Sequence, residues 1–363
     1  MKLRVLVVDD TIFYRKIISD VLSQLSEVEV VGTAGNGRIA LTRIESLKPD
    51  LITLDVEMPV LDGLGVLKEI KKRGLDIGVI MVSTLTKRGT EITMKALELG
   101  AFDFITKPDA ETLEENFKAL LLALRPRIRA FVRRYELRKA LRRKKTDLKL
   151  KEKVVHVPGE VVRKVELERR VEKSDIVAIG ISTGGPNALT TMLPMLPGDL
   201  GVPVVVVQHM PPMFTKSLAD NLDQKCALKV KEGEDGEPLV PNTVYIAPGG
   251  KQMKVAAGVA GTKVLRITDD PPENNCKPAA DYLFRSVARQ FKSKATGVIM
   301  TGMGNDGTLG LKVMKSFGAV TIAQDEETSV VYGMPKMAIE AGVIDIIAPL
   351  DKIAQEIVNT VRR

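Results

Sequence analysis

Short apolar runs alternate with segments of helix length along almost the whole chain. Each run is nearly continuous in its apolar character, which is typical of parallel strands buried on both faces. Strands that alternate with helices in this way indicate an α/β fold, in which helices cover both faces of a parallel sheet. Because 363 residues are too many for one ordinary domain, we expect two.

The N-terminal region, residues 1–122, contains five of these strand–helix units. The expected strands are Leu3–Val8, Val28–Val31, Leu51–Leu54, Val79–Val82 and Phe102–Ile105. Helical patterns such as Leu64–Lys72 and Glu91–Leu99 lie between them, and Gly100 ends the latter. This pattern predicts a doubly wound, five-stranded sheet.

The same alternation resumes in the C-terminal region, residues 173–363. The expected strands are Ile176–Ile179, Val202–Val207, Thr243–Ala247, Lys263–Ile267, Gly297–Met300, Ala319–Ala323 and Val343–Ile347. A region of about 190 residues is of normal size for one domain. We therefore expect a second α/β domain.

The segment between the two domains, residues 123–172, is strongly basic. From Arg125 to Lys173 there are 19 lysines and arginines and seven acids, a net charge of +12, whereas the whole chain carries +8. Its leucines allow an amphipathic helix that Pro126 would kink at its entry and Pro158-Gly159 would end. We interpret the segment as a solvated linker; a docking segment for an acidic partner is the alternative.

Composition excludes several classes of protein. Two cysteines, Cys226 and Cys276, are too few for a disulfide framework or a cysteine metal cluster. No apolar run approaches the roughly 18 residues that span a bilayer, and the N-terminus lacks a signal peptide, so we expect a cytoplasmic protein. DNA binding through the basic segment is disfavoured because no helix-turn-helix pattern accompanies it.

Acidic, hydroxyl and lysine side chains follow four of the five N-terminal strands. They are Asp9, Asp10, Asp55, Ser83, Thr84 and Lys107. The carboxyl ends of parallel strands meet at one edge of a sheet, so we expect these groups to converge. Crowded carboxylates need a hard cation such as Mg²⁺. Together with a lysine and a hydroxyl they predict a site that accepts a phosphoryl group.

With this ordered set, residues 1–122 resemble the receiver domain of two-component response regulators. The resemblance implies a flavodoxin-like fold and phosphorylation of Asp55 by a histidine kinase. It also implies that Mg²⁺ is held by Asp10, Asp55 and the backbone carbonyl of Glu57, with Asp9 in support. Ser83 and Phe104 would rearrange on phosphorylation, although the neighbouring Thr84 leaves open which hydroxyl acts.

Three segments of the C-terminal domain each end an apolar run with a chemically distinctive residue. They are Gly180-Ile181-Ser182-Thr183-Gly184-Gly185, Gln208-His209-Met210 and Gly302-Met303-Gly304-Asn305-Asp306-Gly307. The glycines beside Ser182 permit a tight strand-to-helix turn that exposes the side chain. A serine, a histidine and an aspartate at strand ends of one sheet are the parts of an acyl-transfer nucleophile.

Other interpretations of these residues remain open at this stage. Gly-x-Ser-x-Gly alone is a weak pattern that also suits a phosphate-binding turn, although the lysine of a phosphate loop is missing. His209 could be a core histidine. Asp281 and the pair Asp269-Asp270 compete with Asp306 for the role of the aspartate. Asp306 is preferred because its glycine-rich turn follows a buried strand, as for the other two residues.

The combination of a receiver, a basic linker and these three motifs resembles the chemotaxis response-regulator methylesterases (CheB type). The resemblance implies hydrolysis of glutamate γ-methyl esters on chemoreceptor helices, with deamidation of receptor glutamines in many relatives. It implies Ser182 as nucleophile, His209 as base, Asp306 as orienting carboxylate, and oxyanion contacts at Thr183 and the backbone N–H of Met303. It requires no metal in the esterase site. Cys276 departs from the pattern, because many relatives have a histidine there.

Overall fold

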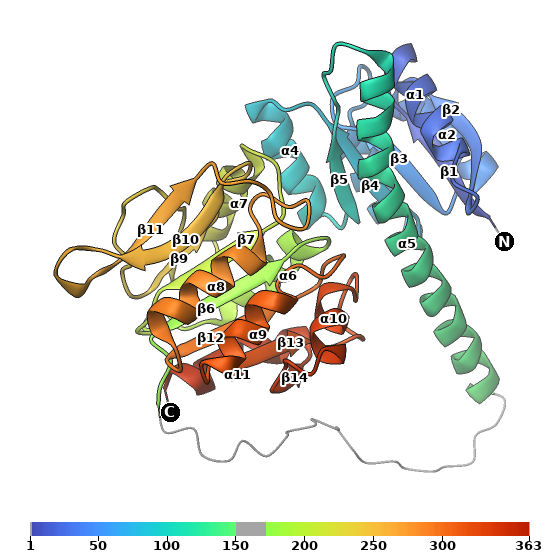
Figure 1. The fold of residues 1–363 in the computed structure, drawn as a ribbon. Helices are drawn as coiled ribbons and strands as arrows, with labels where there is room; N and C mark the ends of the chain where they lie inside the picture. Colours follow the sequence, from blue (N-terminus) through green and yellow to red (C-terminus); the bar gives the residue numbers. More distant parts are fainter. Residues whose placement is uncertain (1, 150–171, 363) are drawn as a thin grey trace. The chain divides into compact units, whose positions relative to one another are not determined.

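The computed structural model describes residues 2–149 and 172–362, with the side chains of residues 137–149 left out (Figure 1). The chain divides into two compact units, Met1–Pro158 and Gly159–Arg363. Within the described residues, no helix is both long enough and apolar enough to cross a membrane.

The N-terminal unit is a five-stranded parallel sheet with helices between the strands. Its elements are β1 (Leu3–Val8), α1 (Ile12–Ser23), β2 (Val28–Ala34), α2 (Gly37–Leu47), β3 (Leu51–Asp55), α3 (Gly63–Lys72), β4 (Gly78–Ser83), α4 (Lys87–Glu98), β5 (Asp103–Thr106) and α5 (Leu113–Lys149). The strand order is β2-β1-β3-β4-β5. All five expected strands are present, with ends that differ by a few residues. The prediction of a doubly wound sheet is confirmed.

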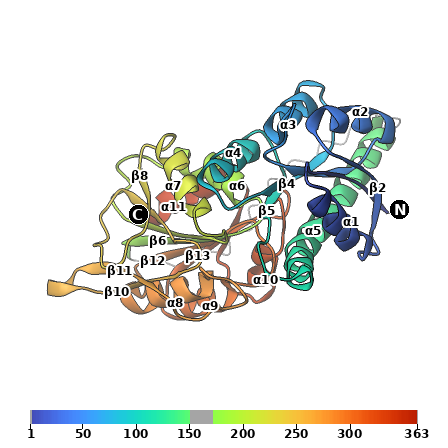
Figure 2. The ribbon, with the colours of Figure 1, turned by 90° about the horizontal axis from the view of Figure 1, so that it is seen from above.

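Helices cover both faces of this sheet (Figure 2). Helices α1 and α5 pack against each other on one face, and α2, α3 and α4 form a row on the other. Strands β1, β3 and β4 are apolar and almost wholly buried between them, which explains why their sequences do not alternate between apolar and polar residues.

Helix α5 continues well beyond residue 122, where the sequence suggests that the linker begins. Pro126 lies inside the helix and does not end it. The ring removes one backbone donor, and the nearby carbonyl of Ala123 accepts a hydrogen bond of 2.9 Å from Arg127 Nη1. Beyond the proline, Phe131 packs edge-on against Phe102 and fixes the helix to the sheet. The rest of the basic segment, residues 150–171, lies outside the described residues.

The C-terminal unit is built on a seven-stranded parallel sheet in the order β14-β13-β12-β6-β7-β9-β8. Its elements are β6 (Ile176–Ile181), α6 (Gly185–Met192), η1 (Leu193–Met195), β7 (Val204–Gln208), α7 (Phe214–Asp223), β8 (Lys229–Glu232), β9 (Thr243–Ile246), β10 (Gln252–Ala257), η2 (Val259–Gly261), β11 (Lys263–Thr268), α8 (Ala280–Phe291), β12 (Ala295–Ile299), α9 (Thr308–Ser316), β13 (Val320–Gln324), α10 (Met334–Glu340), β14 (Ile346–Ala348) and α11 (Leu350–Val361).

Two features of this unit differ from expectation. The expected strand at Lys263–Ile267 belongs to a separate antiparallel hairpin, β10–β11, and not to the parallel sheet. Strands β8 and β10 are not anticipated. Strand β8 is a four-residue edge strand rich in charge, and such a sequence carries little of the apolar signal of a buried strand. The remaining expected strands are present.

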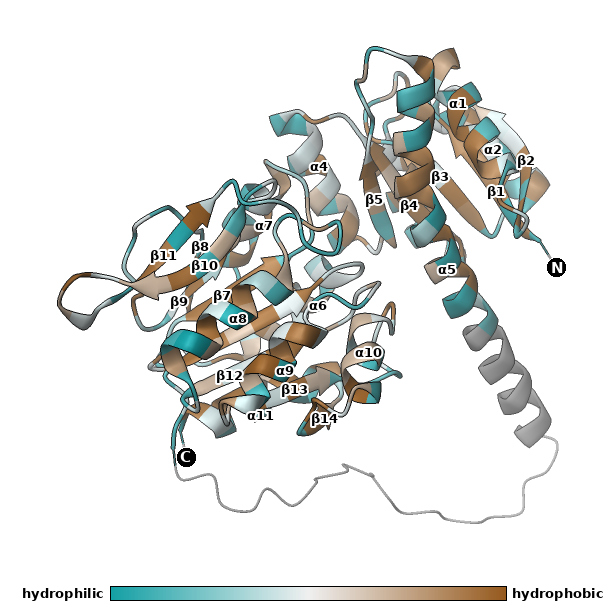
Figure 3. Cartoon of the chain, in the orientation of Figure 1, coloured by the Kyte–Doolittle hydropathy of each residue, from teal (hydrophilic) through white to brown (hydrophobic). Residues whose placement is uncertain are grey.

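Two helical layers enclose the parallel sheet. Helices α6, α7 and α11 lie on one face and α8, α9 and α10 on the other (Figure 2). Apolar residues concentrate on the central strands and on the helix faces turned toward them (Figure 3). Within this core Phe284 of α8 is fully buried and lies against three glycines, at 180, 307 and 310. Small residues on the sheet and on α9 therefore let α8 approach closely.

We expect Phe284→Ala to lower the free energy of unfolding by about 3–5 kcal/mol, because it removes a large side chain and leaves a cavity between close-packed elements. Phe317→Ala is the matched control, since Phe317 is 42% exposed and its loss should cost far less. Urea unfolding of both variants, followed by circular dichroism, measures the difference. Equal destabilisation would contradict this account of the core.

Candidate active site

The three residues singled out in the C-terminal domain follow three neighbouring strands. Strand β6 lies between β12 and β7 at the centre of the sheet. Ser182 follows β6, His209 follows β7, and Asp306 lies in the turn after β12. The register pairs Ile181 with Gln208, so the serine and the histidine leave the sheet at the same level. All three residues therefore lie at one edge of the sheet, as predicted from the sequence.

Backbone contacts fix the turn that carries Ser182. Its N–H donates to the carbonyl of Thr301 (3.0 Å), and its own carbonyl accepts from the N–H of Gly185 (2.7 Å). Gly184 caps the following helix with φ +77°, a left-handed conformation that glycine adopts without strain. The chain therefore turns sharply from strand to helix at the serine.

The segment around Met303 approaches this turn closely. A Cβ atom on Gly302 would lie 2.8 Å from the Cβ of Ser182 and 2.3 Å from the sulfur of Met334. Only a glycine leaves room for this approach. The hydroxyl of Thr301 donates to the carbonyl of Thr183 (3.0 Å), which holds that buried residue in place. Thr183 is next to Ser182 along the chain. Met303 is brought close to Ser182 because its neighbour Gly302 packs against the serine.

Gln208 ties the serine turn to the histidine turn. Its Nε2 donates to the carbonyl of Ser182 (3.0 Å) and to that of His209 (3.3 Å), and its side chain is buried. The backbone N–H of His209 also donates to the carbonyl of Ile181 (3.1 Å). This role of Gln208 was not predicted from the sequence. A polar amide that ends a run of valines in a buried strand is the signal that could have identified it.

Asp306 is a buried carboxylate with four donors around it. Its Oδ2 accepts from His209 Nε2 (2.8 Å) and from the backbone N–H of Ala280 (2.6 Å). Its Oδ1 accepts from the backbone N–H of Asp281 (3.0 Å) and from Asn274 Nδ2 (3.0 Å). The two backbone donors belong to the first turn of α8, where the helix dipole also favours negative charge. These contacts orient the carboxylate toward the histidine.

The competing acids occupy other places. Asp281 does not contact His209; its carboxylate accepts from the N–H of Gly310 (2.6 Å) and from Asn274 Nδ2 (2.9 Å), and burial raises its pKa. Asp269 and Asp270 are exposed and form ion pairs with Lys251 and Lys254. Of the aspartates that the sequence left as alternatives, Asp306 is therefore the one hydrogen-bonded to the histidine.

Asn274 bridges the two buried carboxylates, and no pattern in its local sequence predicts this role. One nitrogen, Nδ2, lies 3.0 Å from Asp306 Oδ1 and 2.9 Å from Asp281 Oδ2. Its backbone is left-handed, with φ +51°, and asparagine tolerates this conformation better than most residues. The partial positive charge of the Asn274 NH₂ group lies between the carboxylates of Asp281 and Asp306 and offsets part of their mutual repulsion.

The contacts of Asp306 decide which nitrogen of His209 is available for chemistry. Burial alone would raise the pKa of Asp306, but the hydrogen bond and charge of His209 and the two backbone N–H groups hold it below its ordinary value. An ionised carboxylate only accepts hydrogen bonds, so the hydrogen sits on Nε2. When the ring is neutral, Nδ1 holds the free lone pair.

The pKa of His209 is raised. Burial opposes the charged ring, but the hydrogen bond to Asp306 and the contact with Cys276 outweigh it and raise the pKa to about 9. The Cys276 sulfur lies 3.7 Å from Nδ1. Within the described parts of the chain, neither ring nitrogen is hydrogen-bonded to Ser182. Such bonds often form only when substrate is present.

In the N-terminal unit, the acidic groups and the lysine converge as expected. Lys107 Nζ lies 2.8 Å from Asp9 Oδ2 and 2.8 Å from Asp55 Oδ2. Oxygens of Asp9, Asp10 and Asp55 lie within 4.8 Å of one another, an all-oxygen donor set that suits Mg²⁺. Burial and then the charge of Asp9 raise the pKa of Asp55 to about 6, although Lys107 opposes the shift. A divalent cation would relieve this repulsion.

The expected switch residues lie beside these acids. Ser83 is fully buried and its hydroxyl donates to the carbonyl of Thr84 (3.2 Å), whereas Thr84 itself is exposed. Ser83 is also hydrogen-bonded to Lys107, whose backbone N–H donates to the Ser83 carbonyl (2.8 Å). The ring of Phe104 is already buried, 4% exposed, so an inward turn on phosphorylation would start from a buried position.

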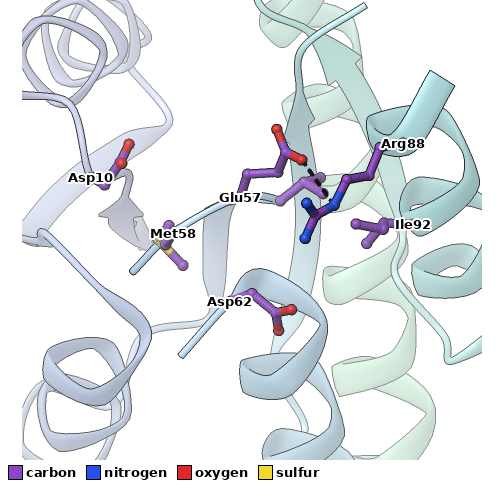
Figure 4. Close-up of a pocket in the computed structure, with 7 residues that line it drawn as sticks. Asp10, Glu57, Met58, Asp62, Arg88 and Ile92 are labelled. Atoms are coloured by element: carbon purple, nitrogen blue, oxygen red, sulfur yellow. Dashed lines mark ion pairs between the residues drawn. The ribbon is translucent and has the colours of Figure 1, made fainter. Parts of the chain in front are cut away.

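A pocket of about 380 Å³ opens beside the acids and is shown in Figure 4. Asp10, Glu57, Asp62 and Arg88 line it together with apolar side chains. The Glu57 carboxylate is paired with Arg88 Nε at 3.4 Å (Figure 4). The Glu57 side chain is therefore engaged with Arg88. The resemblance assigns to the metal the backbone carbonyl of Glu57, which takes no part in this ion pair.

Comparison with known proteins gives matches to both units. The family described as CheB methylesterase matches residues 177–357, and the response regulator receiver domain family matches residues 5–118. The chain is similar to the protein-glutamate methylesterase/protein-glutamine glutaminase of Desulfotalea psychrophila, with 53% identity over 364 residues and 99% of each chain covered. It is also similar to the protein of the same name from Bacillus subtilis, with 45% identity over 373 residues and 99% of each covered.

A solved structure agrees with these matches. The catalytic domain of the Thermotoga maritima CheB methylesterase superposes with a TM-score of 0.50 and 46% sequence identity. The match covers 52% of this chain and 99% of that domain. The similarity therefore extends over most of the C-terminal unit.

We expect His209 to titrate near pH 9 in ¹⁵N NMR spectra, because the group that raises its pKa most is the hydrogen-bonded carboxylate of Asp306. Asp306→Asn removes that negative charge and should lower the pKa well below 9. Asp269→Asn, an exposed acid without contact to the ring, should leave it unchanged. Since the folded pKa exceeds the roughly 6.5 of an unfolded histidine, the ring stabilises the fold below that pH and loses this contribution as pH rises through about 9. A wild-type pKa at or below 6.5 would contradict the assignment.

Proposed function

The chain belongs to the family of CheB methylesterases with an N-terminal receiver domain, and we propose that Ser182, His209 and Asp306 are its catalytic residues. The proposed reaction is hydrolysis of γ-methyl esters of glutamate side chains on chemoreceptor helices, with release of methanol. The observation that carries the proposal is the 2.8 Å hydrogen bond between His209 and a buried aspartate, beside a serine on a tight strand-to-helix turn.

The proposed mechanism follows from the tautomer that Asp306 imposes. Nδ1 of His209 accepts the proton of the Ser182 hydroxyl as the oxygen attacks the ester carbonyl. The negative charge of the tetrahedral intermediate faces Thr183 and the backbone N–H of Met303, and a single donor of this kind contributes about 10²–10³ in rate. Methanol leaves with the proton from Nδ1, and a water molecule then attacks the acyl-enzyme by the same route.

The same chemistry extends to glutamine side chains. An amide carbonyl attacked by Ser182 gives the same acyl-enzyme and releases ammonia in place of methanol. The relatives from Desulfotalea psychrophila and Bacillus subtilis are named for both activities. We include deamidation of receptor glutamines in the proposal. No step of either reaction requires a metal in the esterase site.

The receiver domain is proposed to regulate this activity. Asp55 would accept a phosphoryl group from a chemotaxis histidine kinase. Mg²⁺, held by Asp9, Asp10, Asp55 and the carbonyl of Glu57, would neutralise the charge of the incoming phosphate. Lys107, already in contact with Asp55, would pair with the phosphoryl oxygens, and Ser83 would donate a hydrogen bond to them. Ser83 and Phe104 would carry the change to the surface of the domain.

The proposed setting follows from the substrate. The enzyme would work in the cytoplasm and reach the membrane only through the receptors, with no nucleic acid as a partner. The basic segment between Arg125 and Lys173 offers charge complementary to glutamate-rich receptor helices.

We expect Ser182→Ala, His209→Gln and Asp306→Asn each to reduce methanol release from methylated receptor membranes by at least about 10³-fold, because the three residues act as one unit. Ser316→Ala, which removes an exposed serine on α9, is the matched control and should retain full activity. Circular dichroism establishes that each variant is folded. Near-normal turnover in His209→Gln would refute the triad, since the domain has no other histidine.

A second experiment tests regulation by the receiver. Acetyl phosphate with Mg²⁺ should increase methanol release by the wild-type protein, and Asp55→Asn should abolish the increase while leaving the basal rate. Asp20→Asn, an exposed aspartate on α1, should respond as the wild type does. If Asp55→Asn is stimulated as strongly as the wild type, phosphorylation of this residue does not control the esterase.

A further inference from the structure

A thiol lies against the nitrogen of His209 that the mechanism uses. Cys276 Sγ is 3.7 Å from His209 Nδ1, and the side chains of both residues are partly exposed. The pair is therefore open to small solutes. The proposed mechanism assigns no role to the Cys276 thiol.

The thiol is held in place by its own turn. The N–H of Cys276 donates to the carbonyl of Glu273 (2.7 Å), and the N–H of Glu273 donates to the carbonyl of Cys276 (3.1 Å). The sulfur also contacts the carbonyl of Asn274 at 3.5 Å. Asn274 is fixed in turn by its two carboxylate contacts. These hydrogen bonds hold the sulfur in its position beside the imidazole ring.

The spacing of the two atoms fits a shared metal ion. Zinc sites have Zn–S distances of about 2.3 Å and Zn–N distances of about 2.0–2.1 Å, so a tetrahedral ion places its sulfur and nitrogen ligands about 3.6 Å apart. The observed separation is 3.7 Å. One ligand atom from each of His209, Cys276 and Asp306 lies within 4.8 Å of the other two. Thiolate and imidazole are ligands that select zinc over harder cations.

We propose that Cys276 and His209 form an inhibitory site for Zn²⁺, with Sγ and Nδ1 as the protein ligands and water at the remaining positions. The inference rests on the proposed function, because the inhibited reaction is the one assigned to His209. Binding releases the thiol proton to solvent, and a second proton when the ring is charged.

Zinc at this site blocks the base directly. Nε2 of His209 is occupied by its hydrogen bond to Asp306 (2.8 Å), so Nδ1 is the nitrogen that accepts the proton of Ser182. An ion that takes the lone pair of Nδ1 leaves the serine without a base. Inhibition should therefore reduce turnover rather than the affinity for the receptor.

This site differs in chemistry from the acid cluster of the receiver. Asp9, Asp10 and Asp55 supply only carboxylate oxygens, which suit Mg²⁺. Excess Mg²⁺ in an assay should therefore fill the acid cluster and leave the thiol–imidazole pair free. The effect of Zn²⁺ on the thiol–imidazole pair can therefore be measured while Mg²⁺ occupies the acid cluster.

The first test titrates the full-length protein with Zn²⁺, its free concentration set by a chelator, in excess Mg²⁺. Methanol release should fall in the wild type, and Cys276→Ser should need at least about tenfold more Zn²⁺ for half-inhibition, because a hydroxyl is a poor ligand for zinc. Each variant is compared with its own zinc-free rate. Cys226→Ser and His156→Gln are the controls and should be inhibited as the wild type is; His156 lies outside the described residues.

The second test does not depend on enzyme activity. Co²⁺ added to the full-length protein in excess Mg²⁺ should give a thiolate-to-cobalt charge-transfer absorption, which should be lost in Cys276→Ser and retained in Cys226→Ser. If the cobalt band forms but neither the wild-type protein nor any variant hydrolyses receptor esters, the proposed function is wrong and the metal site is supported. If Cys276→Ser is inhibited by Zn²⁺ as strongly as the wild type, or if the band persists in it, the site proposed at Cys276 is wrong.

Discussion

The arrangement of the esterase site depends on one buried carboxylate. Asp306 accepts hydrogen bonds from His209, from two backbone N–H groups at the start of α8 and from Asn274. These donors keep it ionised despite burial, and the ionised carboxylate decides that Nε2 of the histidine carries the hydrogen. The other nitrogen is thereby left for proton transfer, and it is this nitrogen that faces the thiol of Cys276. The proposed catalysis and its proposed inhibition by zinc therefore both depend on the hydrogen bond between Asp306 and His209.

Both units place their chemistry at the carboxyl ends of parallel strands. In the C-terminal unit the serine, the histidine and the aspartate follow β6, β7 and β12, which are neighbours in the sheet. In the receiver, Asp9 follows β1 and Asp55 is the last residue of β3, and these two strands also pair. Successive βαβ units wind in opposite directions from these central strands, which opens a crevice above them. The two sites thus use the same property of the fold, for the proposed phosphoryl transfer in one unit and the proposed acyl transfer in the other.

Sequence patterns were enough to predict the α/β class, most of the strands and the strand ends that carry Ser182, His209 and Asp306, because long apolar runs and glycine-rich turns leave a strong local signal. The rest depends on contacts between distant segments. Asn274 reaches Asp306 across 32 positions of the chain, and nothing in its local sequence indicates this. The hairpin strand β10 and the charged edge strand β8 lack a buried-strand pattern. Helix α5 passes through Pro126 because packing of Phe131 beyond it outweighs the local preference.

The most direct measurement of the central claim is covalent labelling of the nucleophile. A fluorophosphonate reacts fast with a serine whose proton is removed by a neighbouring base and only slowly with an unactivated hydroxyl. Mass spectrometry of the digested, full-length protein should find one adduct, on Ser182, and its rate of formation should fall sharply in Asp306→Asn, where the histidine is no longer oriented. An adduct on another residue, or labelling of Ser182 at an equal rate in Asp306→Asn, would contradict the account.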